Sequence, residues 1–309
     1  MLFANPFTRP GHWFKGSLHV HSTASDGALT PDEVVDWYQS RGYHFLALAD
    51  HDVLSEAQSP ANDFITLSGI EVKGIDQQAG LFHLVGLGLR RQPKPVEKAG
   101  VSMQEAINRL QAAGGLVWVA HPYWSGQMSK DLLEIEGCMG IEVYNGSCEV
   151  ENGRGFSTVH WDDLLTAGRR LLGLAVDDAH WQNGSKDAGL GWVWVKAAAL
   201  TQEAILDALE QGYFYASSGP QIHDLQLNAE QGDISIRCSP SVLVDFIGDG
   251  LNSCRVSAPP GGTLTEASYR LQDHQRYVRV ACQDTHGRWA WSNPIICRAR
   301  APHSLVYAP

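Results

Sequence analysis

The chain has 309 residues, of which 44% are hydrophobic and 18% charged, so it can bury a full core, and its composition excludes intrinsic disorder and a collagen-like fibre. The net charge of −11 argues against a protein that grips a long nucleic acid, because such proteins usually carry a basic stripe. Since no apolar run reaches the roughly 18–20 residues of a membrane helix and no secretory signal pattern is present, we expect a cytoplasmic protein without membrane contact.

Up to Pro220 the sequence alternates strand-like apolar runs with helix-like segments. The strand-like runs are 17–21, 45–50, 64–72, 81–87, 116–121, 140–145, 171–177 and 191–196. Between them, Thr30 and Ser102 each begin a capping-box pattern, and a third helix is expected from Thr201 to Gly212. This alternation predicts an α/β fold with a mainly parallel sheet, either open or closed as a barrel.

The composition changes after Pro220. Residues 221–309 contain 8 arginines, no lysine and 8 acidic residues, so the excess negative charge lies before them. Short alternating runs at 233–237, 241–246, 277–282 and 290–296, separated by turn patterns, predict a small antiparallel β-sandwich-like domain. We therefore divide the chain into a first domain, residues 1–220, and a second domain, residues 221–309.

Histidine and carboxylate residues end nearly every strand-like run of the first domain. The i, i+2 spacing of His19 and His21 puts both rings on one face of a strand, and the same spacing joins Asp178 and His180. The other candidates are Asp26, His51, Glu71, His83 and His121. Because functional groups gather at strand carboxyl ends in parallel α/β folds, these side chains, together with Asp50 and Asp52 beside His51, should meet at one rim.

Each of these residues, taken singly, has a structural explanation. A lone histidine at a strand end is more often hydrogen-bonded than metal-bound, Asp26 fits a turn, and Asp50 or Asp52 fits a helix cap. The set as a whole has no such explanation, because six histidines buried together without partners would carry a large desolvation cost. The pattern therefore predicts metal binding.

In their order along the chain, these motifs resemble the PHP (polymerase and histidinol phosphatase) family of metal-dependent phosphoesterases. The segments that match are 19–22, 25–27, 49–52, 69–71, 83, 121–122 and 178–180. The resemblance covers roughly residues 15–220. It implies a distorted (β/α)7 barrel of PHP type with up to three metal ions at the carboxyl ends of the strands.

The resemblance also implies a division of the ligands among three metals. The first set is His19, His21, Glu71 and Asp178; the second is Glu71, His83 and His121; the third is Asp26, His51 and His180. Glu71 would bridge the first two metals, and Asp26 stands where some relatives have histidine. Imidazole and carboxylate ligands without thiolate suit Zn²⁺, Mn²⁺ or Fe and do not choose among them. We therefore expect two to three divalent metal ions as cofactors.

Three carboxylates are the candidate catalytic residues. Glu71 and Asp178 are expected to hold the metals. Asp50 precedes the candidate ligand His51 and could orient it, because a metal-bound histidine usually donates its other N–H to an acceptor.

Four further residues are candidates for substrate binding. Lys73 lies two positions beyond Glu71 on the same strand face, and Arg154 lies between two glycines as a possible phosphate clamp. Asn145 ends a strand-like run, and Tyr123 follows His121 at the rim, where its ring could stack on a planar group. For Lys73 and Arg154, the alternative is an ordinary solvated side chain.

Our leading hypothesis is a hydrolase that cleaves a small phosphomonoester or phosphodiester with metal-activated hydroxide. Residues 290–294 and the C-terminal domain resemble a PHP subgroup that includes enzymes described as carbamate hydrolases, so a carbamate or carboxyl ester hydrolase is an alternative. A non-catalytic metal-binding scaffold is another, although the complete ligand set argues against it. A nuclease subunit of a polymerase is disfavoured by the short, acidic chain. The substrate, the native metal and the oligomeric state stay open.

Overall fold

The computed structural model describes residues 3–56, 58–61, 63–96, 100–182, 184, 186–228, 231–272 and 274–297. The helices are α1 (Pro31–Gln39), α2 (Met103–Ala112), α3 (Ser129–Leu133), α4 (Gly146–Asn152), α5 (Thr158–Thr166) and α6 (Gln202–Glu210). The strands are β1 (His12–Val20), β2 (Phe45–Leu48), β3 (Gln58–Ala61), β4 (Phe64–Leu67), β5 (Gly69–Asp76), β6 (Gly80–Leu87), β7 (Leu116–Val119), β8 (Gly140–Asn145), β9 (Leu172–Val176), β10 (Trp192–Ala197), β11 (Phe214–Ser217), β12 (Ile222–Asn228), β13 (Asp233–Ser241), β14 (Leu243–Gly248), β15 (Cys254–Ser257), β16 (Leu264–Arg270), β17 (Tyr277–Gln283), β18 (Trp289–Ser292) and β19 (Ile295–Ile296). The predicted mixed α/β character is confirmed. No helix in these ranges is long and apolar enough to cross a bilayer.

Three sheets organise the described residues. An 11-stranded sheet runs β15-β14-β17-β18-β11-β10-β1-β2-β4-β3, with β19 beside β17; a 5-stranded sheet runs β5-β6-β7-β8-β9; and a 3-stranded sheet runs β12-β13-β16. The pairs β1–β2, β2–β4, β7–β8 and β8–β9 are parallel, as predicted. However, β5, β6 and β7 pair antiparallel, and so do β1 and β10. A regular alternation of parallel strands and helices is therefore not observed.

The two larger sheets enclose one hydrophobic core. Leu18 of β1 and Val195 of β10 pack there with Trp118 of β7 and Leu174 of β9, and Ile205 of α6 joins them. All five side chains are buried, which removes their apolar surface from water. This packing fixes the carboxyl ends of β1, β2 and β9 relative to β5, β6 and β7.

Of the two predicted capping boxes, the one at α1 forms completely and the one at α2 forms in part. Thr30 forms the complete capping box with Glu33 at the start of α1. At α2, Ser102 accepts a hydrogen bond from the Glu105 N–H, but the Glu105 carboxylate accepts from the Arg109 guanidinium at 2.9 Å. Only half of the second predicted capping box therefore forms, because the i+4 arginine engages the glutamate carboxylate.

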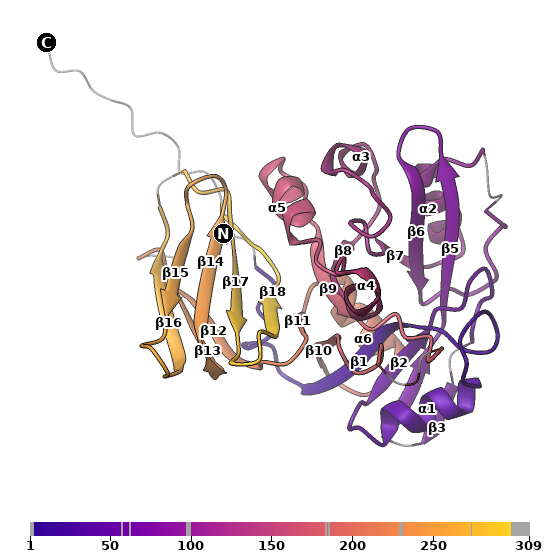
Figure 1. Ribbon diagram of the computed structural model, residues 1–309, viewed down its shortest axis with the longest axis horizontal. Coiled ribbons are helices and arrows are strands. Elements are labelled where there is room, and N and C mark those ends of the chain that lie inside the picture. The colour runs from indigo at the N-terminus through magenta and orange to yellow at the C-terminus, as the bar shows by residue number, and fades with distance from the viewer. Residues whose placement is uncertain are drawn as a thin grey trace, which may run out of the picture.

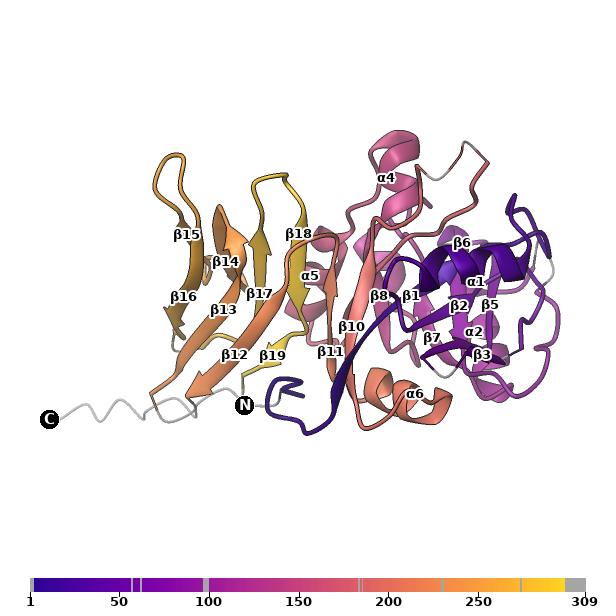
Figure 2. The same cartoon turned by 90° about the horizontal axis from the view of Figure 1, so that it is seen from below.

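The largest sheet continues past the predicted domain boundary at Pro220. Strand β11 pairs antiparallel with β18, placing Tyr215 opposite Ser292 and Ser217 opposite Ala290. Figures 1 and 2 show the strands that follow residue 220 at one end of the molecule and α1, β5 and β6 at the other. A continuous backbone ladder therefore joins the two predicted domains.

An ion pair reinforces this connection. Asp162 of α5 accepts from Arg279 of β17 through both oxygens, at 2.7 Å from Nε and 2.6 Å from Nη2. Arg279 is only 2% exposed, and its guanidinium lies 5.0 Å from the centre of the Trp161 ring. The C-terminal strands are thus tied to α5 by a largely desolvated charge pair.

Candidate metal centre

The nine predicted ligands lie together where the two larger sheets meet. Isolated bridges join the sheets at this point, one between Val20 and Ala179 and one between His51 and Glu71. The backbone N–H of Asp178 donates to the carbonyl of His19 at 2.8 Å, which holds the loop after β9 against β1. The predicted convergence on one rim is therefore observed.

Four side chains form the tightest group. Each of His19, His21, Glu71 and Asp178 offers one ligand atom, and these atoms lie within 4.8 Å of one another. The Nε2 atoms of His19 and His21 are 3.2 Å apart. Asp178 Oδ1 lies 3.3 Å and 3.0 Å from these nitrogens, and Glu71 Oε2 lies 3.4 Å from both. This is the first ligand set that the family resemblance implied.

The donor atoms of this group fit a divalent cation. Asp178 Oδ1 is buried and has no hydrogen-bond partner among the residues that the structure describes. The two facing imidazole nitrogens cannot both keep lone pairs at 3.2 Å without a shared proton or cation between them. Two imidazoles and two carboxylates form a donor set that suits Zn²⁺, Mn²⁺ or Fe. A bound cation would satisfy all four buried atoms.

Glu71 is the centre of the second group. Its Oε1 lies 2.8 Å from His83 Nδ1 and 3.4 Å from His121 Nε2. Its Oε2 lies 3.0 Å from His51 Nδ1 and also faces the first group. Because each oxygen addresses a different set of imidazoles, the carboxylate is placed as a bridging ligand would be.

Asp26 is the centre of the third group. Its Oδ2 lies 3.4 Å from His51 Nε2, and its Oδ1 lies 3.5 Å from His180 Nε2. His21 Nδ1 is also 3.5 Å from Asp26 Oδ1, which the family resemblance did not imply. Asp26 is 44% exposed, so this group is the most open of the three. His21 therefore has one ring nitrogen in the first group and one beside the third.

The buried carboxylates make the cluster strongly attractive to cations. Although burial opposes it, hydrogen bonds and charges from Asp178 and Glu71 raise the pKa of His21 to about 9. The same carboxylates, together with Glu142, outweigh burial and raise the pKa of His19 well above its ordinary value. Without metal, protons occupy these imidazoles, so metal ions and protons compete for the same nitrogens.

The metal-free protein should therefore lose stability as the pH rises from 6.5 to about 9. The pKa of His21 is 6.5 ordinarily and about 9 in the folded protein. The protonated ring therefore stabilises the fold fully below pH 6.5, and this stabilisation is lost as the pH rises through about 9. Bound metal should weaken or reverse this trend, because it binds the neutral imidazole. Urea denaturation of metal-free and metal-loaded protein across this range measures the difference. A metal-free protein that became more stable with rising pH would contradict the prediction.

Asp50 lies at the cluster but has a different role from the predicted one. Its carboxylate accepts hydrogen bonds from the Ser22 N–H at 2.8 Å, the Ser22 hydroxyl at 2.7 Å and the Ser25 hydroxyl at 2.7 Å. These bonds engage the carboxylate with the turn after β1 instead of the ring of His51. Asp50 therefore fastens the loop that carries Asp26 to the end of β2.

A cavity of about 760 Å³ opens above the candidate ligands. Lys73, a candidate for substrate binding, lines it, and so does Lys186. The ring of Trp124 forms part of the wall, 5.0 Å from the ring of His121, and its indole N–H donates to Glu151 at 2.8 Å. The wall therefore combines two cationic groups with one fixed aromatic face.

Three of the predicted substrate-binding residues do not line this cavity. Asn145 is fully buried, and its amide donates to Asp178 Oδ2 at 3.1 Å while its oxygen caps α4. Tyr123 lies under the guanidinium of Arg154, 5.3 Å from ring centre to cation, and neither reaches the cavity wall. Asn145 supports a candidate ligand, whereas Tyr123 and Arg154 contact each other and are not part of the cavity lining.

Sequence reasoning also missed a residue. Glu142 is fully buried in β8 and accepts from the ring Nδ1 of His19 at 2.7 Å. The available signal was a glutamate inside an otherwise apolar strand run, because a buried carboxylate needs partners.

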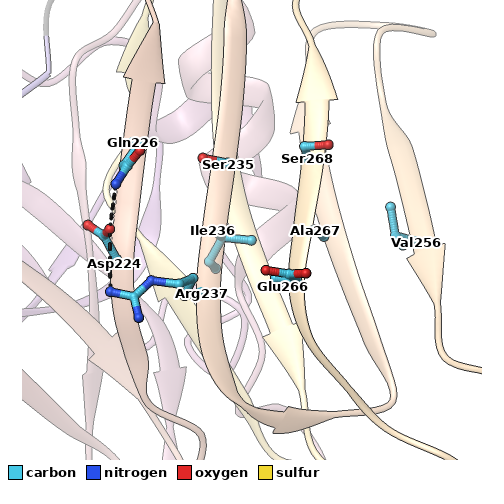
Figure 3. Close-up of a pocket in the computed structure, with 9 residues that line it drawn as sticks. All are labelled: Asp224, Gln226, Ser235, Ile236, Arg237, Val256, Glu266, Ala267 and Ser268. Atoms are coloured by element: carbon cyan, nitrogen blue, oxygen red, sulfur yellow. Dashed lines mark hydrogen bonds and ion pairs between the residues drawn. The ribbon is translucent and has the colours of Figure 1, made fainter.

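A second hollow lies on the C-terminal strands (Figure 3). It measures about 550 Å³ and is lined by residues of β12, β13, β15 and β16. Asp224 and Arg237 form an ion pair of 3.6 Å there, and Gln226 donates to Asp224. Within the described part of the chain, no histidine or cysteine lines this hollow, so the chemistry points to the cavity above the nine candidate ligands.

Backbone strain is concentrated around the candidate metal centre. Among the described residues, five non-glycine residues have positive φ: Asp52, His121, Asp178, Trp181 and His274. The first four lie in the loops after β2, β7 and β9. Such conformations cost about 1–3 kcal/mol each and persist only when surrounding contacts enforce them.

Comparison with known sequences gives partial matches. No protein-family model matches the chain. Over 103 residues it is 35% identical to a 5'-3' exoribonuclease of Haemophilus influenzae. This aligned segment covers 32% of this chain and 37% of that protein. Over 77 residues it is 44% identical to a 3',5'-nucleoside bisphosphate phosphatase of Chromobacterium violaceum. This aligned segment covers 23% of this chain and 27% of that protein. The matches thus span about a third of these curated relatives or less.

Comparison of structures covers much more of the chain. A crystal structure from Bacteroides vulgatus, described as a two-domain protein containing a predicted PHP-like metal-dependent phosphoesterase, superposes with a TM-score of 0.51. The match covers 89% of this chain and 92% of that one at 17% sequence identity. The chain has a PHP-like fold. The resemblance that the motifs indicated is thus confirmed for the fold, and the nine candidate ligands of this chain meet where its two larger sheets join.

Proposed function

We propose that the protein is a metal-dependent phosphoesterase that hydrolyses a small phosphomonoester or phosphodiester. The observation that carries this proposal is the convergence of nine imidazole and carboxylate side chains beneath an open cavity in a PHP-like fold. The names of two partial relatives, a nucleoside bisphosphate phosphatase and an exoribonuclease, support a phosphoester substrate.

The cofactors in this proposal are two to three divalent ions of Zn, Mn or Fe. The three groups around Asp178, Glu71 and Asp26 would hold them, and a trinuclear site would use all nine ligands. When bound, such ions lower the pKa of water and neutralise charge on a phosphoryl group. Glu71 would keep neighbouring ions close together, because both of its oxygens face imidazoles.

The cavity wall suits a small anionic substrate with a planar part. Lys73 and Lys186 offer ammonium groups to ester oxygens. Trp124 offers a flat apolar face, and its hydrogen bond to Glu151 fixes the orientation of the indole. Because the protein carries −11 overall, attraction of an anion would depend on bound metal and these local cations.

The same proposal includes the architecture of the two domains and the cellular location of the enzyme. We interpret the first 220 residues as a distorted (β/α)7 barrel and residues 221–309 as a β-sandwich-like domain. The core shared by the two larger sheets supports the first interpretation, and the antiparallel strands β12–β19 support the second. We also propose that the enzyme acts in the cytoplasm on small molecules and not on long nucleic acids. The acidic charge supports that choice of substrate.

The test combines elemental analysis with hydrolysis assays on one purified sample. The substrates are p-nitrophenyl phosphate, its bis ester, p-nitrophenyl acetate and a short single-stranded RNA. Two to three metals per chain with phosphate ester hydrolysis would support the proposal and rank monoester against diester. Release from the acetate alone would favour a carboxyl or carbamate ester hydrolase, and preference for RNA would contradict the small-molecule substrate. Metal without any hydrolysis would favour a scaffold.

A further inference from the structure

Both carboxylate oxygens of Glu142 accept hydrogen bonds from groups inside the protein. Its Oε1 accepts from His19 Nδ1 at 2.7 Å and from the Trp118 indole N–H at 3.1 Å. Its Oε2 accepts from the His121 backbone N–H at 2.9 Å and from the Asn145 amide at 2.9 Å. The side chain is 0% exposed, so no water replaces any of these four donors. A buried carboxylate satisfied by four donors is held in one orientation.

The first consequence concerns the tautomer of His19. A carboxylate only accepts hydrogen bonds, so His19 must carry a proton on Nδ1. In the neutral ring, Nε2 then has a free lone pair. That nitrogen points at the first ligand group, 3.4 Å from Glu71 Oε2 and 3.3 Å from Asp178 Oδ1. Glu142 thus prepares His19 to bind a cation through Nε2.

The second consequence concerns two other candidate ligands. His121 has a φ of 27°, an unfavourable value for a residue with a side chain, and its N–H is held by Glu142. Asn145 donates to Glu142 and, at 3.1 Å, to Asp178 Oδ2, which leaves Asp178 Oδ1 facing the cluster. One carboxylate therefore supports ligands from the ends of β1, β7 and β9.

We propose that Glu142 is a positioning residue that sets the His19 tautomer and the placement of His121 and Asp178; this inference rests on the proposed metal site. An amide cannot replace the carboxylate. In either orientation its NH₂ group would face two donors, the pair from His19 and Trp118 or the pair from His121 and Asn145. Glu142→Gln therefore keeps the shape of the side chain but disrupts its hydrogen bonds.

The experiment titrates metal-free protein with Co²⁺ and Zn²⁺ and records the visible absorption spectrum of the Co²⁺ form. We expect Glu142→Gln to bind about 10–100-fold more weakly than the wild type, with an altered Co²⁺ spectrum, because loss of a partner behind a ligand typically has this effect. Asp245→Asn is the matched control. It changes another buried carboxylate, on β14 and paired with Arg255, and should leave metal affinity unchanged.

The outcomes separate this inference from the proposed function. If Glu142→Gln kept the metal affinity and the Co²⁺ spectrum of the wild type, the proposed role of Glu142 would be wrong, but the proposed metal site would stand. A wild-type protein that binds neither metal would overturn the metal site itself. If Glu142→Gln does not fold, Glu142→Asp provides the comparison, because it keeps the charge but withdraws the oxygens by about one bond length of ~1.5 Å. Wild-type metal affinity in Glu142→Asp would then contradict the inference.

Discussion

Replacing His21 by alanine should lower kcat/KM for a phosphoester by more than about 100-fold, since loss of a residue merely behind a metal ligand already costs 10–100-fold. His21, like His51, is an imidazole that faces two groups. Its Nε2 lies 3.0 Å from Asp178 Oδ1, and its Nδ1 lies 3.5 Å from Asp26 Oδ1. Its loss should therefore reduce the number of bound metals as well as the rate, which elemental analysis and p-nitrophenyl phosphate turnover measure together.

A histidine outside the cluster provides the control. His223 is exposed on β12, and His223→Ala should keep both metal content and rate. Far-UV circular dichroism of both variants would show that the fold is retained. A His21→Ala protein with wild-type turnover would contradict the assignment of this cluster as the catalytic centre.

Replacing Asp162 by alanine should destabilise the protein by about 3 kcal/mol, since removal of one partner from a buried ion pair leaves the other charge uncompensated. Arg279 is almost fully buried, and its Nη1 already has no hydrogen-bond partner among the described residues. Asp162 is partly exposed at 29%, which places the expected effect at the lower end of the range for buried pairs. Urea denaturation, followed by tryptophan fluorescence, measures the free energy of unfolding.

The matched control is an exposed ion pair on the C-terminal strands. Asp233 pairs with Arg270 at 2.9 Å, and their side chains are 38% and 67% exposed. Asp233→Ala should change stability by only about 0–1 kcal/mol, because solvent screens surface pairs. Equal destabilisation by the two substitutions would show that the Asp162 pair does not anchor the C-terminal strands.

Local chemistry made several parts of the fold predictable, and tertiary pairing hid others. The helix starts at Thr30, Ser102 and Thr201 were readable because side-chain capping needs only neighbouring residues. The apolar pattern predicts one strand over residues 64–72, but this segment forms β4 and β5, which belong to different sheets. Both halves are buried, so the apolar pattern has no break. The chain leaves β4 at Ser68, and β5 begins at Gly69, where a Cβ would lie 2.6 Å from the Leu48 carbonyl oxygen.

The candidate site divides in the same way. The candidate ligands could be found because most of them lie at the ends of strand-like runs, and because His19 and His21, like Asp178 and His180, are spaced two residues apart. Glu142 could not be assigned, because its partner His19 is 123 residues away. Nor could sequence show that, of the adjacent Tyr123 and Trp124, only Trp124 lines the cavity. Those directions depend on how the backbone turns after β7.

The left-handed backbone at Asp52, His121, Asp178 and Trp181 affects how this protein would respond to laboratory evolution. Glycine or asparagine adopts such conformations at lower cost, so a screen for heat resistance alone would enrich these residues there. At His121 and Asp178 the same replacements remove candidate ligands. Thermostable clones from such a screen should therefore include many that bind less metal, and the screen would need to select for metal retention as well as heat resistance.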